Sequence, residues 1–152
     1  MSIINIYILV DTEKIKGLKP GKIEDAKDYI AMYDDQHHGL YTNIDKSDLI
    51  TSVSNGDLLI WTLLPSDKNL SEEDYPQFNS IEDSTNRKLD GKGPLFTDNK
   101  ALIFDRNRKA SAAISDSISD SMSGKNSYII SFKISCNTYW WDPFVEARGG
   151  DD

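Results

Sequence analysis

The stretch SYIISFKIS, residues 127–135, constrains the fold of this chain more than any other part of the sequence. Apolar side chains stand at every second position, and this period of two is that of a β-strand with one face in a core. We predict that the core face of this strand consists of Tyr128, Ile130, Phe132 and Ile134.

Other runs also have the composition of short strands. They are rich in β-branched or aromatic residues and are separated by turn signals. These runs are residues 3–10, 28–35, 101–105 and 139–147.

A hairpin is predicted around Asn55-Gly56, the favoured residue pair for a tight reversal. Residues 48–53 would form its first arm and residues 58–64 its second arm. The faces that pack against residues 127–135 are expected to come from Ile4, Ile6, Ile8, Leu58 and Ile60.

Two segments have less regular patterns. In residues 110–124, Ala110, Ile114, Ile118 and Met122 recur at every fourth position, which suits one face of a short helix. The serines between them lower helix propensity, so a flexible serine-rich loop is the alternative. Residues 66–99 are polar, and we predict a long loop, with or without one short strand, that proteases cut early.

About seven short strands with at most one short helix describe an antiparallel β-sandwich. The chain has 152 residues, which fits one domain with a core of its own. No internal repeat or linker divides it. We expect a single domain at residues 1–148 and a flexible tail at residues 149–152.

Composition argues against several classes of partner. The chain carries 25 acidic and 17 basic residues, a net charge of −8, and no basic stripe, which argues against nucleic acid. Cys136 is the only cysteine, so no internal disulfide can form. The N-terminal apolar run lacks the flanks of a signal peptide and is too short to span a bilayer, so we expect no membrane association and a cytoplasmic location.

No motif for catalysis is present. The sequence lacks a phosphate-binding loop, a nucleophile elbow and HExxH, and one cysteine cannot build a zinc site. His37 and His38 are adjacent and would point to opposite sides of an extended chain, which disfavours a shared metal. We therefore expect no enzyme activity, no cofactor and no metal.

The aromatic cluster NTYWWDPF, residues 137–144, contains candidate contact residues. In an extended chain Tyr139 and Trp141 share one face, and Trp140 shares the other with Asp142. Because an unpaired buried carboxylate is costly, the Asp142 face should look toward solvent, which leaves Trp140 partly exposed. Pro143 cannot donate to a ladder, so we expect an edge or a bulge there.

Flat aromatic rings stack on the apolar faces of sugars. We therefore consider a site for a ligand or partner, with core packing as the alternative for each side chain. The candidate residues are Trp140, Tyr139, Trp61 and Tyr41.

Three stretches keep their order along the chain: INIYILVDTEKI, then DLITSVSNGDLLIW, then the pair YIISFKI and YWWDPFVEA. Taken together, they resemble the AidA/PixA family of bacterial inclusion-body proteins. The resemblance implies an all-β, immunoglobulin-like sandwich and a cytoplasmic bacterial protein, in some members stored in inclusions. It supplies no catalytic residues, and the presence of only three methionines argues against a methionine-rich storage role.

The sequence thus predicts a non-enzymatic protein that self-associates into a homo-oligomer, because unpaired backbone groups at strand edges template further pairing. A β-sandwich that binds a carbohydrate or another small molecule is the alternative. A secreted effector is a third hypothesis, for which the sequence shows no export signal.

Overall fold

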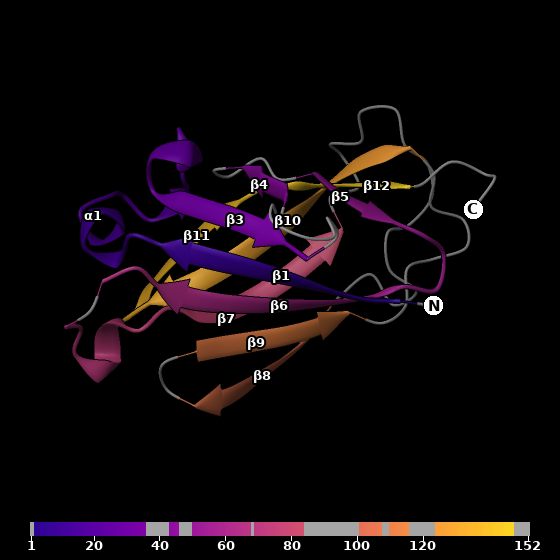
Figure 1. The fold of residues 1–152 in the computed structure, drawn as a ribbon. Helices are drawn as coiled ribbons and strands as arrows, with labels where there is room; N and C mark the ends of the chain where they lie inside the picture. Colours follow the sequence, from indigo (N-terminus) through magenta and orange to yellow (C-terminus); the bar gives the residue numbers. More distant parts are fainter. Residues whose placement is uncertain are drawn as a thin grey trace.

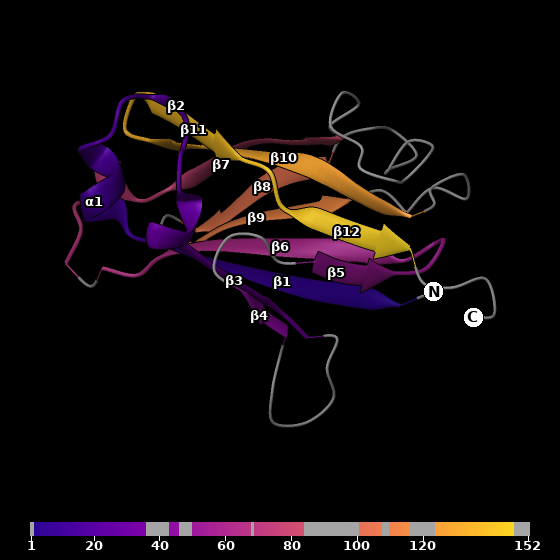
Figure 2. The same cartoon turned by 90° about the horizontal axis from the view of Figure 1, so that it is seen from above.

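The computed structural model shows two β-sheets packed face to face. Figure 2 views the two layers from above. The predicted all-β sandwich is confirmed, although parallel pairs make the sheets mixed and the chain forms more strands than the sequence predicts. The structure describes residues 2–35, 43–45, 50–67, 69–83, 101–107, 110–115 and 124–147.

The first sheet is built around β1 and β6, two long strands that run parallel to each other (Figure 1). The other neighbouring pairs in this sheet are antiparallel. In spatial order its strands are β4 (Asn43–Asp45), β3 (Ile30–Asp34), β1 (Ile3–Val10), β6 (Leu58–Pro65), β9 (Ala110–Ser115) and β8 (Ala101–Asn107).

The second sheet is built around β10, which pairs with β7 on one side and with β11 on the other. β12 pairs with the beginning of β10, and Asp142 and Pro143 separate it from β11. Its strands are β2 (Gly21–Lys22), β11 (Asn137–Trp141), β10 (Lys125–Ile134), β12 (Phe144–Ala147), β5 (Ile50–Val53) and β7 (Gln77–Asp83).

A short helix that the sequence patterns did not reveal, α1 (Thr12–Lys16), follows β1. Asp11 caps it by accepting a hydrogen bond from the Lys14 backbone N–H at 3.2 Å. Two single-turn 3₁₀ helices, η1 (Ala26–Asp28) and η2 (Glu72–Asp74), lie in the connections. The Lys16 ammonium meets the Asp74 carboxylate at 2.8 Å and so ties α1 to η2.

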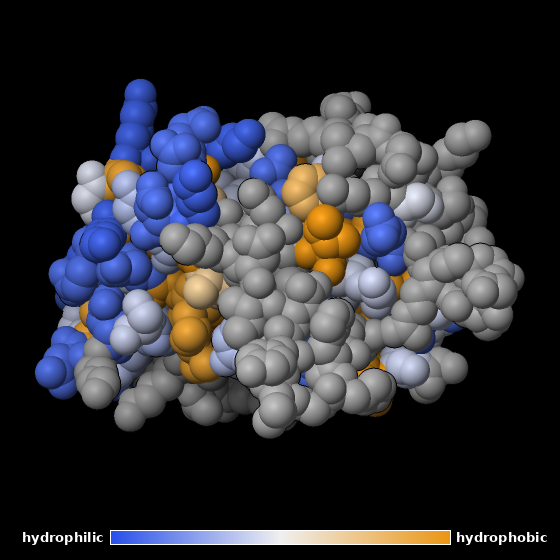
Figure 3. Space-filling view, turned by 45° about the horizontal axis from the view of Figure 1, so that its top comes forward, coloured by the Kyte–Doolittle hydropathy of each residue, from blue (hydrophilic) through white to orange (hydrophobic). Residues whose placement is uncertain are grey.

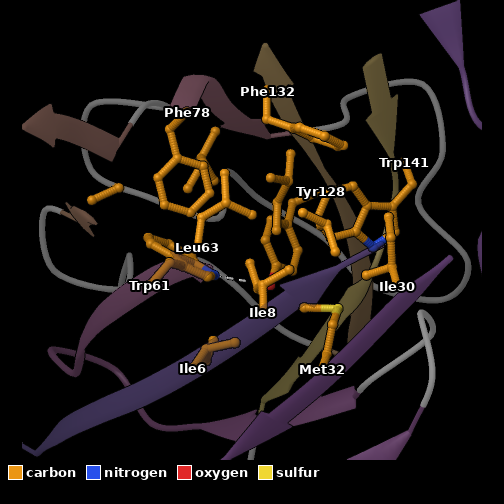
Figure 4. Packing of buried hydrophobic residues seen from close by; sticks show 14 of the residues in the cluster. Ile6, Ile8, Ile30, Met32, Trp61, Leu63, Phe78, Tyr128, Phe132 and Trp141 are labelled. Carbon is orange, nitrogen blue, oxygen red and sulfur yellow. Dashed lines mark hydrogen bonds between the residues drawn. The ribbon is translucent and has the colours of Figure 1, made fainter. Parts of the chain in front are cut away.

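The core lies between the sheets, and Figure 4 shows how its large side chains meet. The predicted core face of β10 is confirmed, because its four apolar side chains are at most 1% exposed. The alternate residues of β1 pack from the opposite sheet, as predicted for Ile4, Ile6 and Ile8. Burial of each large apolar side chain stabilises the fold by about 1.5–3 kcal/mol.

The predicted face of β6 is wrong by one residue. Leu59, Trp61 and Leu63 fill the core, whereas Leu58 and Ile60 point outward. A shift of one residue exchanges the two faces of a strand. Since β6 is apolar on both faces, its pattern could not select the buried one.

The predicted hairpin does not form, because its two arms belong to different sheets. β5 pairs with β12, while β6 pairs with β1 and β9. The turn between them is present, with Gly56 at a φ of +85°, which glycine adopts without strain. The buried Asp57 carboxylate holds it by accepting from the backbone N–H groups of Ser54 and Ser2 at 2.8 and 2.9 Å.

Residues 110–115 form strand β9 and not the predicted helix. The buried hydroxyl of Ser111 accepts a hydrogen bond from the Phe78 N–H at 3.0 Å, and that of Ser115 accepts one from the Leu59 N–H at 2.8 Å. These serines thus satisfy backbone groups of neighbouring strands, a tertiary role that helix propensity does not register.

The polar segment 66–99 contains η2 and β7. A single strand within the described part of this segment agrees with the prediction of a long loop with or without one short strand. Several predictions lie outside the described residues. They concern the histidine pair, Tyr41, Ile118, Met122, residues 84–99 and the C-terminal tail.

Candidate functional site

Trp140 lies on the outer side of the second sheet and is half-buried. Its neighbour across the sheet is Lys22 on β2, whose ammonium lies 5.5 Å from the centroid of the indole ring. The Ile23 N–H donates to the Trp140 carbonyl at 2.9 Å and extends the pairing of β2 with β11. Trp140 and Lys22 thus form an exposed cation–π pair, a contact of about 0.5–1 kcal/mol.

A pocket of about 270 Å³ is lined by Lys22 of this pair and, at the end of β11, by Trp141 but not by Trp140. Its wall includes two lysines, Lys22 and Lys27, and the carboxylates of Glu24, Asp25 and Asp142. Side chains of both charges stand within one small pocket and offer both hydrogen-bond donors and acceptors. Such a pocket suits a hydroxyl-rich ligand without a large net charge.

The pattern expected for NTYWWDPF agrees with the structure. Tyr139 and Trp141 are at most 2% exposed and face the core, while Trp140 and Asp142 remain partly accessible. Pro143 interrupts the line of β11 and β12, and its carbonyl accepts a hydrogen bond from the Tyr128 N–H at 3.0 Å.

Two of the predicted contact residues are closed to a partner. Trp61 and Tyr139 are both fully buried. The Trp61 indole donates to the Tyr128 hydroxyl at 3.1 Å, and the Tyr139 ring packs 5.9 Å from that of Phe132. Both side chains stand on the inward face of their strands, so we leave them out of the site. Trp140 alone, among the three predicted contact residues in the described ranges, can meet a partner.

The buried titratable groups link the two sheets. Burial raises the pKa of the Tyr128 phenol far above its ordinary value. The Asp34 carboxylate, on β3, accepts from the Thr51 hydroxyl on β5 at 2.9 Å, which connects the two layers.

At the surface, the hydrogen bond with Asp74 raises the pKa of Lys16. In the described part of the chain, acidic and thiol or imidazole side chains form no group of three that could hold a metal ion.

A second surface, which the search for contact residues missed, is the outer face of the first sheet. Its outward residues on β1, β3, β6 and β9 include no acidic or basic side chain, and we call this surface the uncharged face. The Tyr7 and Tyr33 rings stack there at 5.2 Å. Its residues are Ile3, Asn5, Tyr7, Leu9, Ala31, Tyr33, Leu58, Ile60, Thr62, Leu64, Ala112 and Ile114.

The nearly continuous apolar runs of β1 and β6, broken only by Asn5 and Thr62, are the signal that could have revealed this face. Strands buried on both sides are apolar at nearly every position, whereas a strand with one solvated face alternates. In Figure 3, hydrophobic surface lies next to the strongly hydrophilic end of the molecule that carries α1. Among the described elements, no helix lies over the uncharged face (Figure 2).

The helices of the described segments are all too short or too polar to cross a membrane. No family model and no curated protein matches the sequence. The fold is nevertheless similar to that of an inclusion body protein (PixA) from Burkholderia cenocepacia. The TM-score is 0.66 at 14% sequence identity, over 97% of this chain and 96% of that chain.

A cysteine protease inhibitor from Entamoeba histolytica is a more distant structural match. Its TM-score is 0.34 at 14% identity, over 65% of this chain and 84% of the inhibitor. The similarity to the PixA structure, which extends over nearly the whole chain, is a similarity of fold.

Proposed function

We propose that this chain is a non-enzymatic, inclusion-body-type protein of the bacterial cytoplasm that acts by self-association. The observation that carries the proposal is the correspondence of its fold, from end to end, with a PixA inclusion body protein. The three stretches that resemble the AidA/PixA family support the same conclusion from the sequence.

The physical basis for self-association lies in the surface. The net charge of −8 opposes contact between copies, and the opposition is smallest at the uncharged face, whose strands contribute no charged side chain. Contiguous apolar surface is typical of sites that bind another protein, and on this face Ile3 is 54% exposed while its apolar neighbours are mostly half-buried.

Sedimentation velocity over a concentration series, together with microscopy of producing cells, tests the proposal. We expect the mean mass to rise with concentration and dense bodies to form in the cells. A protein that stays monomeric throughout, in cells without such bodies, would contradict it.

A carbohydrate-binding module is the second candidate, and the accessible Trp140 ring, whose partner Lys22 also lines the pocket, favours it. A glycan screen of the wild type and of Trp140→Ala addresses this function. We expect a binder that is lost in the variant, with Lys133→Ala, an exposed change on the adjacent strand, as the control. Absence of any binder, or binding that Trp140→Ala leaves intact, would remove this candidate.

A further inference from the structure

We propose that the uncharged face is the contact between two copies of this chain, packed face to face with their β1 strands antiparallel. The inference rests on the self-association proposed above and names the surface and the symmetry that produce it.

The charge distribution favours this face over the other one. The outer side of the second sheet carries Lys22, Glu82, Lys133 and Glu146, so a second copy docked there would desolvate charges. On the uncharged face the four strands contribute no charged side chain. The charges beside it lie at its two ends: the Asp35 carboxylate, which accepts from the Asn5 side-chain amide at 2.8 Å, and Asp11, Lys27 and Asp28 at the end of β1. The centre of the first sheet can therefore meet a second copy without desolvating a charge on its strands, whereas the second sheet carries Glu82 and Lys133 on the paired strands β7 and β10.

The shape of the face fits a second copy. Ile3, at the start of β1, is 54% exposed and projects from one end of the face. At the other end of β1 lies a hollow of about 250 Å³. Its apolar wall comes from Leu9, Tyr29, Ile30 and Ala31, and its polar wall from Asp11, Lys27, Asp28 and Ser66. The two features lie about 20 Å apart, from the rise of an extended strand.

A two-fold axis in the contact plane, perpendicular to β1, brings Ile3 of each copy over the hollow of the other. Both contacts then form at once, and the assembly closes as a dimer. The Tyr7–Tyr33 stack lies between the two ends of the face, where the copies pack around the axis.

The size of the face sets the strength expected of the contact. Four strands about 4.8 Å apart and about 23 Å long cover a flat area of roughly 450 Å². A standard interface buries about 800 Å² per partner, so we expect a weak dimer that forms only at high concentration.

The test compares two single substitutions that add the same charge at exposed strand positions. Ile3→Glu removes the projecting side chain and puts a carboxylate over the hollow, twice in each dimer. Ser52→Glu, on β5 of the second sheet, is the matched control. In sedimentation velocity we expect Ile3→Glu to weaken the dimer about tenfold or more, and Ser52→Glu to leave the dissociation constant unchanged.

A second variant, Thr62→Glu, places the charge on β6, next to Tyr7 and Ala112 in the register. It should also dissociate the dimer while its circular dichroism stays that of the wild type. If the wild type associates and both face variants associate equally well, the uncharged face is not the contact, although self-association stands. A monomeric wild type overturns both proposals. A face variant that loses stability at concentrations where the wild type is monomeric shows that the chain itself covers the face, which also overturns this inference.

Discussion

Replacing Phe132 by alanine tests the packing that holds the two sheets together. The side chain is fully buried on β10, with ring centroids 5.7 Å from Trp141 and 5.9 Å from Tyr139. Truncating a buried phenylalanine costs about 3–5 kcal/mol, through lost transfer free energy and the cavity left behind. Each aromatic pair contributes about 0.5–1.5 kcal/mol beyond its burial, so the expected loss lies at the upper end, about 4–5 kcal/mol.

Urea unfolding followed by circular dichroism measures this loss of free energy, and a thermal scan measures the accompanying fall in Tm. For a domain of this size 1 kcal/mol shifts Tm by about 2–4 °C, so Tm should fall by about 8–20 °C. Lys133→Ala, at the neighbouring exposed position of β10, is the control and should change the free energy of unfolding by at most about 0.5 kcal/mol. A loss below about 1 kcal/mol in Phe132→Ala would refute the core face assigned to β10.

Substitutions at four further residues test other parts of the structure. Trp140→Phe should remove the red-shifted, quencher-accessible part of the tryptophan fluorescence, whereas Trp141→Phe should lower Tm; the reverse pattern contradicts the register of β11. Because burial raises the pKa of Tyr128, its ionisation favours the unfolded chain. Its contribution is complete below about pH 10 and is lost above it by about 1.4 kcal/mol per pH unit, so the stability of Tyr128→Phe should fall less steeply in urea unfolding at alkaline pH. Asp57→Ala leaves two backbone N–H groups without their acceptor and should cost about 1–3 kcal/mol by urea unfolding, and Asp57→Asn, which keeps one carbonyl oxygen, should cost less.

The sequence alone was sufficient where one face of a strand is apolar and the other is not. In β10 the alternation of large apolar residues with Ser131 and Lys133 identified the core face. In β11 the cost of burying Asp142, the residue that follows the strand, correctly predicted that Trp140 points outward and Trp141 inward. Both conclusions follow from local chemistry, because a strand has a side-chain period of two and a charge resists burial.

Patterns within one segment were insufficient where the deciding contacts come from elsewhere in the chain. β6 is apolar at almost every position, and only its parallel register with β1 decides that Trp61 faces the core and Ile60 does not. The Asn55-Gly56 pair correctly indicated a turn, but a turn does not determine whether its arms pair with each other. Ser111 and Ser115 appeared unsuited to a buried element until the backbone N–H groups of other strands supplied their partners.

The sequence by itself therefore determined the all-β class, the core face of β10 and the half-exposed position of Trp140. Only the tertiary structure decided the pairing of strands and the surfaces that result from it. The uncharged face exists because β1 and β6, more than 50 residues apart in the chain, lie side by side in parallel, with Ile3 opposite Leu58. Neither strand alone shows such a surface, since the face that a strand leaves outside depends on the partner that covers its other side.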